Sequence, residues 1–234
     1  MNGGTYWMSR LMARPDIDHR QLVSLGGLDP YGQHQALWRL FSVPSATQRA
    51  HAEFLFRADQ GDDGLPIFYV LSRNELHDAG GLWSSAMKLY APDIAAGDRF
   101  AFKLRANPTV ARKLGVDGRG QRHDVVMDMK RRLGWQVLPE AERPSLASIA
   151  QEAGVAWLCG RSQRLGCEFE QASLRADGYR TWRQRRGKGV SFSFLDFEGS
   201  LSVTDPSLFC EALYRGVGPA KAFGCGLLMI RRLE

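Results

Sequence analysis

The sequence predicts an α+β protein built from two similar units in tandem. In residues 1–107, segments with the alternation of strands and segments with the period of helices follow in the order strand, helix, strand, strand, helix, strand. The second half repeats this order less regularly. This is the order of the ferredoxin-like βαββαβ fold, whose open sheet face commonly binds RNA. We therefore expect two tandem ferredoxin-like, RRM-like domains.

The first domain is predicted to span 1–107 and to begin with an apolar strand at 6–13. Asp29 and Pro30 are residue types typical of a helix N-cap and a first helical position. A helix is therefore expected from Pro30 through the segment YGQHQALWRLF. Its apolar residues recur at helical spacing, which predicts one buried face.

Two strands joined by a turn are predicted next, at 53–59 and 66–72, because the connecting QGDDGLP has the composition of a hairpin. The segment 82–91 is interpreted as a second helix. The last strand is expected at 99–106, where large apolar residues alternate with polar ones.

A basic, glycine-containing linker is predicted at 108–122, followed by a C-terminal domain at 123–234. In that domain we expect a strand at 123–127 and a helix at 145–166. Two further strands are expected to flank the segment 175–189. Asp205 and Pro206 predict the start of a last helix.

Length and composition are those of an ordinary globular chain of 234 residues with 44% apolar residues. No apolar run approaches the roughly 20 residues that span a membrane, and the N-terminus lacks the pattern of a signal peptide. The four cysteines are scattered without a CxxC motif, so reduced thiols and a cytoplasmic location are expected. These cysteines are Cys159, Cys167, Cys210 and Cys225.

The formal net charge of +6 is unevenly distributed. Residues 1–107 contain 11 basic and 11 acidic residues, whereas residues 108–234 contain 20 and 14. Most basic residues of the second half are arginines, which suit bidentate phosphate contact and stacking on bases. A polyanionic partner is expected, with nucleic acid as the first candidate.

Tyr31 and His34 have the most specific setting of the candidate catalytic residues. They are three residues apart and project from one side of the expected helix. The first turns of a helix favour a bound anion, and a histidine can transfer protons near neutral pH. The alternative is a half-buried histidine that packs beside Trp38. His19 is a rival that has no tyrosine three residues before it.

The segment 175–189 carries the clearest nucleic-acid signal. Basic side chains interleave with Tyr179 and Trp182, and Asp177 alone opposes them. Basic residues neutralise phosphates, while aromatic rings stack on exposed bases. The alternative is a solvated hairpin. The basic residues are Arg175, Arg180, Arg183, Arg185, Arg186 and Lys188.

The glycine-rich stretch RGVGPAKAFGCGLLMI, from Arg215 to Ile230, leaves two interpretations open. Closely spaced glycines around Lys221 can form a concavity of backbone N–H groups for phosphate oxygens. The same pattern is also that of a helix C-cap followed by a tight turn into a buried strand. The spacing matches neither the Walker A motif nor the dinucleotide fingerprint.

These motifs resemble a known family. FKLRANPT (102–109), RGVGPAKAFGCGLL and the YxxH of Tyr31 and His34 are similar to motifs of the CRISPR-associated endoribonucleases of type I-E systems, the CasE family. EGSLSVTDP and AWL (156–158) also fit, so the resemblance covers nearly the whole chain in order.

The resemblance implies tandem ferredoxin-like domains and metal-independent cleavage of a CRISPR repeat transcript at the 3′ base of its stem-loop. It implies products with a 2′,3′-cyclic phosphate and a 5′-hydroxyl, and no metal or small-molecule cofactor. Its implied partners are the repeat RNA, as precursor and as mature guide, and the other subunits of the Cascade complex. No membrane partner is expected.

Within this resemblance, Tyr31 and His34 take the acid–base roles, and Arg39 matches a basic position of some relatives. A non-catalytic RNA-binding subunit and a small-molecule enzyme on the same scaffold remain as alternatives. The remaining candidate RNA-binding residues are Arg105, Asn107, Lys130, Arg131, Gly216, Gly218, Lys221 and Gly224.

Overall fold

The protein is described by a computed structural model that covers residues 5–18, 20–21, 25, 29–41, 54–78, 80–112, 120–183 and 191–234. The chain forms two compact units. The first comprises Met1–Asp93 together with Lys221–Leu227, and the second comprises Ile94–Ala220 together with Leu228–Glu234. The division therefore falls before the predicted boundary at 107, and a short C-terminal segment returns to the first unit.

The sheet of the first unit contains β1 (Trp7–Ala13), β2 (Phe54–Gln60), β3 (Pro66–Ser72) and β4 (Trp83–Leu89). Its order is β2-β3-β1-β4, with every neighbouring pair antiparallel. Helix α2 (Pro30–Trp38) connects β1 to β2. The first strand is thus inserted beside the β2–β3 hairpin, as the ferredoxin-like fold requires.

The prediction of a helix at 82–91 is wrong, because this segment is the edge strand β4. It pairs with β1 from Trp7 opposite Leu89 to Ala13 opposite Trp83. Every residue of β4 after Trp83 is exposed, so the strand carries no core-facing alternation that the sequence could reveal. Pairing with β1 therefore overrides the helix-favouring composition of SSAMKL.

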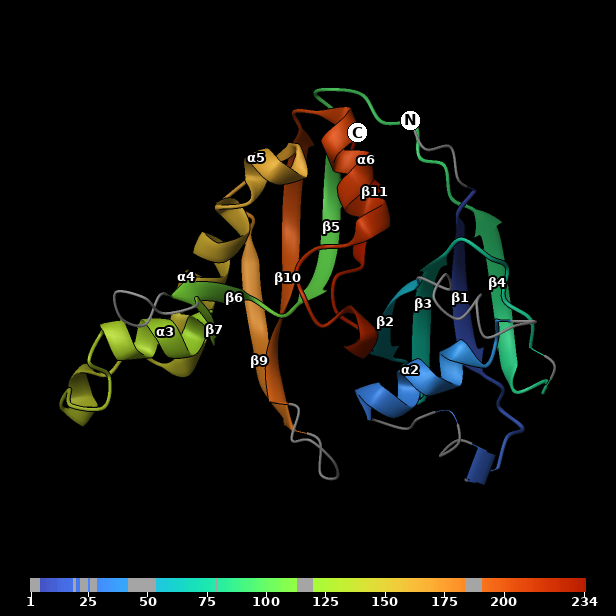
Figure 1. The fold of residues 1–234 in the computed structure, drawn as a ribbon, viewed down its shortest axis with the longest axis horizontal. Coiled ribbons are helices and arrows are strands. Elements are labelled where there is room, and N and C mark those ends of the chain that lie inside the picture. Colours follow the sequence, from blue (N-terminus) through green and yellow to red (C-terminus); the bar gives the residue numbers. More distant parts are fainter. Residues whose placement is uncertain are drawn as a thin grey trace. The chain divides into compact units, whose positions relative to one another are not determined.

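Helix α2 begins as predicted and packs on the sheet of its unit (Figure 1). Asp29 is the N-cap, and its carboxylate accepts a hydrogen bond from the Gly32 amide at 3.1 Å. Leu37 is fully buried in the same core as Phe56 and Phe68 of β2 and β3. The helix thus presents one face to the sheet and leaves the other outside.

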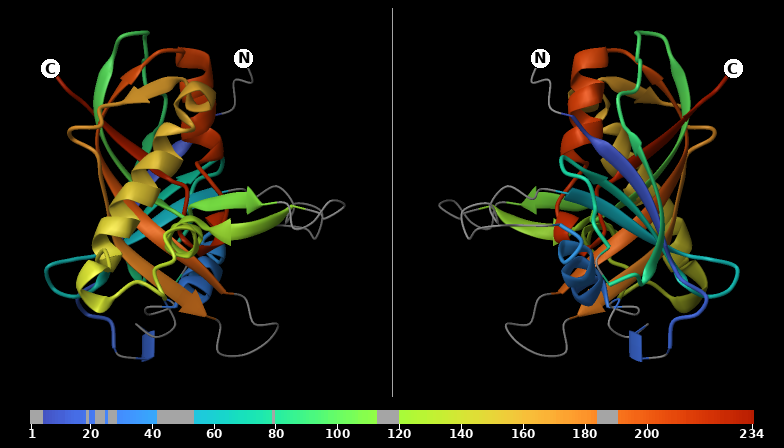
Figure 2. Two further views of the ribbon diagram at one scale, coloured as in Figure 1. Left: turned by 90° about the vertical axis from the view of Figure 1, so that its left-hand side faces the viewer. Right: turned by 90° about the vertical axis from the view of Figure 1, so that its right-hand side faces the viewer.

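The sheet of the second unit has the order β11-β5-β10-β8, with β9 also paired to β10. Its strands are β5 (Arg99–Ala106), β8 (Cys167–Phe169), β9 (Arg175–Arg183), β10 (Ser191–Val203) and β11 (Leu228–Arg232). Helices α4 (Leu146–Cys159) and α6 (Pro206–Arg215) belong to its core (Figures 1 and 2). The order β5, α4, β8 with β9, β10, α6, β11 is a second ferredoxin-like unit.

Strand β5 was predicted to end the first domain but is the first strand of the second. It pairs with β10, with Leu104 opposite Phe197, and on its other side with β11, with Leu104 opposite Leu228. Alternation along 99–106 identifies a strand but does not identify its neighbours, because pairing is a long-range contact.

The predicted linker at 108–122 is largely structured where it is described. Strands β6 (Thr109–Arg112) and β7 (Gln121–Asp124) form a two-stranded ribbon, and residues 113–119 lie outside the described part. The predicted strand at 123–127 is wrong beyond Asp124. The carboxylate of Asp124 accepts from the Met127 amide at 2.8 Å and caps helix α3 (Val125–Arg132).

The predicted helix at 145–166 is two helices. Helix α4 ends at the C-cap Gly160, and α5 (Ser162–Leu165) ends at Gly166, which has a φ of 66°. The described residues also include the short 3₁₀ helices η2 (Glu140–Glu142) and η3 (Lys221–Phe223). In the part of the chain that the structure describes, no helix is long and apolar enough to cross a membrane.

Gly154 brings α4 close to the second sheet. A Cβ at this position would lie 2.7 Å from the Ala176 Cβ and 3.0 Å from Leu195 Cδ1. We expect Gly154→Ala to destabilise the protein by up to about 2 kcal/mol. Overpacking a dense core costs about 1–3 kcal/mol, and the higher helix propensity of alanine returns about 1 kcal/mol. A net loss therefore shows that the steric cost exceeds the gain in helix propensity.

Urea unfolding of Gly154→Ala beside the exposed control Ala147→Gly checks this expectation. The control measures the helix propensity term in the same helix. A Gly154→Ala variant more stable than the wild type would contradict the close approach of α4 to β9 and β10.

Candidate active site

Tyr31 and His34 lie in the first two turns of α2, in the first unit. The Tyr31 side chain is exposed, at 43% of its surface, and His34 is half-buried. Both therefore have surface that a ligand can reach. The rival His19 lies outside the described residues.

The His34 imidazole is packed among aromatic rings of its own unit. It stacks on Phe54 at 5.0 Å between ring centroids and 22° between planes, and on Phe56 at 6.1 Å and 26°. Trp38 lies 6.0 Å away. The predicted alternative of a half-buried histidine that packs beside Trp38 is thus confirmed. Because His34 is also partly exposed, its acid–base role stays a prediction.

Burial lowers the pKa of His34 below its usual 6.5, because the charged form loses solvation. The ring is accordingly neutral at pH 7 and can accept a proton. Its Nδ1 atom is buried and has no hydrogen-bond partner among the described residues.

Arg39 stands apart from this pair. It is the exposed C-cap residue of α2, and its amide donates to the Gln35 carbonyl at 3.4 Å. Helical geometry places it about 140° around the axis from His34.

The glycine-rich stretch divides between the two units. Gly216, with a φ of 74°, is the C-cap of α6, and its amide donates to the Ala212 carbonyl at 2.8 Å. Gly218, with a φ of 80°, packs on Trp157 of the second unit, where a Cβ would lie 3.4 Å from the indole. The C-cap interpretation is therefore confirmed for Gly216.

The segment of η3 belongs to the first unit and packs against α2 and β2. Lys221 begins η3 and is half-buried. Gly224 follows η3 and lies on Phe56. Nothing in the sequence indicates that this segment would join the unit that carries Tyr31 and His34.

The basic segment of the second unit forms β9, which pairs with β10 from Ser191 opposite Arg183 to Glu198 opposite Arg175. Arg175, Arg180 and Arg183 are exposed, as the nucleic-acid hypothesis requires. Tyr179 is half-buried, and its hydroxyl donates to the Asp124 carboxylate at 3.1 Å. The remaining basic residues, Arg185, Arg186 and Lys188, lie outside the described part.

A row of aromatic rings crosses β9 and β10, and the sequence analysis missed most of it. Trp182 lies 5.4 Å from Phe192, and Phe192 lies 6.5 Å from Phe194. Arg180 is opposite Phe194 in the register. The alternation in VSFSF was the signal that could have placed these phenylalanines on one face.

Two residues that are predicted to contact RNA make contacts within the second unit. Arg105 makes a two-point ion pair with Asp196 directly across the sheet, at 3.0 and 2.8 Å, and stacks on Phe194. Asn107 is 6% exposed, and its amide donates to the Ser193 carbonyl. These contacts hold the sheet together, and the RNA-binding role of both residues stays a prediction.

Lys130 and Arg131 lie in the last turn of α3. Arg131 is exposed, whereas the Lys130 ammonium sits 3.5 Å from the centroid of the Trp135 ring. Arg131 is therefore the more accessible of the two for a phosphate.

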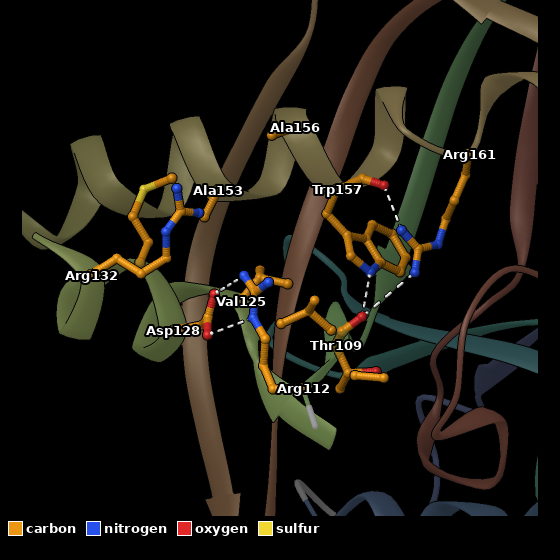
Figure 3. Close-up of a pocket in the computed structure, with 12 residues that line it drawn as sticks. Thr109, Arg112, Val125, Asp128, Arg132, Ala153, Ala156, Trp157 and Arg161 are labelled. Atoms are coloured by element: carbon orange, nitrogen blue, oxygen red, sulfur yellow. Dashed lines mark hydrogen bonds and ion pairs between the residues drawn. The ribbon is translucent and has the colours of Figure 1, made fainter. Parts of the chain in front are cut away.

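A cavity of about 310 Å³ lies between β6, α3 and α4 of the second unit (Figure 3). Arg112 binds the Asp128 carboxylate at 3.1 and 2.6 Å, and Arg161 donates to the Trp157 carbonyl at 2.7 Å. Burial lowers the pKa of Arg161 to about 10. These arginines tie the β6–β7 ribbon to the two helices.

No cluster of three or more histidine, cysteine, aspartate or glutamate side chains that could hold a metal occurs in the described ranges. The four cysteines, all described, are free thiols, and burial raises the pKa of Cys167 to about 12.

Comparison with known proteins gives matches over the whole chain. Residues 6–232 match the sequence model of the family described as CRISPR associated protein. The chain is 28% identical over 239 residues to the CRISPR-associated endoribonuclease Cse3 of Thermus thermophilus, covering 96% of this chain and 99% of that protein. It is 24% identical over 208 residues to the CRISPR system Cascade subunit CasE of Escherichia coli, covering 88% and 93%.

Solved structures share the fold. The endoribonuclease Cse3 bound to a 19-nucleotide RNA superposes with a TM-score of 0.71 and 25% identity, covering 97% of this chain and 99% of that chain. Cas6e of Escherichia coli superposes with a TM-score of 0.54 and 23% identity, covering 97% and 100%.

The buried imidazole predicts a pH dependence of stability. The pKa of His34 is lower in the folded than in the unfolded chain, so the unfolded chain binds more protons as pH falls through 6.5. The contribution of His34 is thus present above this range and is lost below it. We expect the wild type to lose more stability between pH 7.5 and 5.5 than His34→Gln does.

Urea midpoints of both proteins at the two pH values measure this difference, with the exposed His77→Gln as control. Equal losses in the wild type and His34→Gln would contradict the burial of this ring.

Proposed function

The chain belongs to the family of CRISPR-associated proteins, and from this premise we propose that it is a metal-independent endoribonuclease that cleaves CRISPR repeat RNA. The observation that carries the proposal is the pair Tyr31 and His34 at the start of α2, in a chain similar from end to end to a named endoribonuclease. The proposed substrate is the repeat stem-loop, cut at its 3′ base.

In the proposed reaction the RNA supplies the nucleophile. The 2′-oxygen beside the scissile phosphate attacks phosphorus, the bond from phosphorus to the 5′-oxygen breaks, and the products are a 2′,3′-cyclic phosphate and a 5′-hydroxyl. One proton leaves the 2′-hydroxyl and one reaches the 5′-oxygen, so one acid and one base suffice. No metal-bound water is required.

His34 and Tyr31 are the proposed acid and base. The lowered pKa of His34 supports a base at neutral pH, because the ring starts neutral. The phenol of Tyr31, exposed on the same helix, would position or protonate the leaving oxygen. Charge that builds on the phosphate requires a cation, for which we propose Arg39, with Lys221 of η3 as a second source in the same unit.

RNA binding is proposed for the second unit, along β9 and α3. The exposed arginines of β9 would neutralise phosphates, and the aromatic row of Trp182, Phe192 and Phe194 would offer stacking surface. We also propose that the protein is a subunit of Cascade, as the name of the Escherichia coli relative suggests. In this proposal it stays on the mature guide RNA and is located in the cytoplasm.

The function is tested with a synthetic repeat hairpin incubated with protein in EDTA. We expect cleavage by the wild type, none of an RNA with a 2′-deoxy at the scissile nucleotide, and a rate reduced about 100-fold or more by His34→Ala. The exposed His77→Ala is the matched control and should cleave like the wild type.

Two outcomes would overturn the enzyme proposal. Intact RNA that binds tightly would favour the non-catalytic RNA-binding subunit. Affinity that does not change between low and high salt would favour a small-molecule enzyme, because phosphate contacts release counterions.

The basic strand is tested by salt titration. For Arg180→Ala we expect a slope of log K against log salt lower by about 0.7–0.9, the value for one lost phosphate contact. The control is Arg215→Ala, an exposed arginine paired with Glu211 at 2.9 Å on α6. An equal change of slope in both variants would show that the slope depends on the net charge of the protein rather than on a phosphate contact made by Arg180.

A further inference from the structure

Gly224 packs closely against the ring of Phe56. It is buried, with a φ of 79°, and a Cβ there would lie 3.2 Å from Cε2 and 3.5 Å from Cζ of Phe56. Its amide donates to the Lys221 carbonyl at 3.3 Å, within the turn that ends η3. The amide therefore serves the turn, and the missing side chain makes room for a ring.

Phe56 lies between this glycine and the candidate catalytic histidine. Its ring is fully buried and is 6.1 Å from the His34 ring, at 26° between planes. The Phe56 ring also lies 6.0 Å from the Phe54 ring, and the Phe54 ring stacks on the His34 ring at 5.0 Å between centroids. A change in the position of Phe56 therefore acts on His34 directly and through Phe54.

The imidazole plane has few other supports. A catalytic histidine is commonly oriented by a hydrogen bond at its second ring nitrogen. Here Nδ1 is buried and, among the described residues, has no such partner. The rings of Phe54 and Phe56, nearly parallel to the imidazole, are contacts through which its orientation can be set.

We propose that Gly224 and Phe56 are positioning residues for His34. The glycine at the end of η3 sets the position of the Phe56 ring, and this ring sets the plane of the imidazole. The inference rests on the proposed function, since it explains how the base of that reaction is held. It also gives the glycine-rich stretch a role in the catalytic step rather than in binding the RNA backbone.

The titratable and charged groups on the elements packed around His34 are not the cause of its lowered pKa. Tyr31 lies on α2, Arg39 caps this helix, and Lys221 lies on η3. Arg57 and Asp59 alternate along β2 with Phe54 and Phe56, so they face the other side of the sheet. The lowered pKa of His34 has burial as its cause. Loosened packing should therefore raise this pKa toward 6.5.

The first experiment measures cleavage and binding separately for Gly224→Ala. We expect its single-turnover rate constant at saturating protein to fall about 10-fold or more, because small misplacements of a catalytic group cost that much. The Kd for a 2′-deoxy repeat hairpin should stay within about 2-fold of the wild type. A cradle predicts the reverse, a raised Kd with an unchanged rate constant, and that result overturns the proposal.

The matched control is Gly64→Ala. It substitutes an exposed glycine of the same unit, with a φ of 78°, where an added Cβ would lie 3.8 Å from the Gln60 side chain rather than against Phe56. Backbone strain is therefore similar, but the contact with the ring beneath His34 is untouched. An equal loss of rate in both variants would show a general effect of strain.

The second experiment does not depend on cleavage. NMR titration of His34 in the RNA-free protein should give a higher pKa in Phe56→Leu than in the wild type, and an unchanged pKa in Gly64→Ala. This shift of the His34 pKa would still appear in a protein that cuts no RNA. Failure of the proposed function can therefore be distinguished from failure of the positioning proposal. An unchanged His34 pKa in Phe56→Leu overturns the proposal.

A double variant covers the case in which Gly224→Ala does not fold. Leucine is smaller than phenylalanine, so Phe56→Leu should relieve the clash of the added Cβ. We expect the combined variant to fold and its rate constant to fall by less than the product of the two single effects. If Gly224→Ala is unfolded, we expect the combined variant to be more stable than Gly224→Ala alone. Strictly additive losses would contradict contact between these positions.

Discussion

The packing of α2 on the phenylalanines of β2 is the interaction on which the first unit depends. Leu37 of the helix and Phe56 and Phe68 of the sheet are fully buried together, so the helix has one possible face toward the core. That choice fixes His34 at the rim, where one part of its ring stacks on Phe54 and another part remains exposed. Core formation and the geometry of the proposed catalytic histidine therefore depend on the same side chains.

The core side chains that contact His34 also affect its protonation. A histidine at a solvated surface would titrate near 6.5, but the aromatic surroundings of His34 favour its neutral form. The same surroundings supply orientation through ring contacts, since Nδ1 has no hydrogen-bond partner in the described part of the chain. One set of apolar contacts thus governs both the protonation state and the direction of the proposed base.

In the second unit, some arginines form internal ion pairs and others are exposed. Arg105 and Arg112 are engaged by Asp196 and Asp128, and Asn107 by a backbone carbonyl, so they fix strands and helices. Arg175, Arg180 and Arg183 extend along one strand and are exposed. Arginines of one unit therefore differ in their accessibility, and the engaged ones are those beside Asp196 and Asp128.

The sequence alone determined what depends on neighbouring residues: the start of α2 at Asp29 and Pro30, and the strands at 6–13 and 66–72. Caps, turns and alternation are local, so the order of residues contains them. The tertiary structure decided that 82–91 is an edge strand, that 99–106 opens the second unit and that Gly224 lies on Phe56. Each of these depends on contacts between segments far apart in the chain, which local patterns cannot specify.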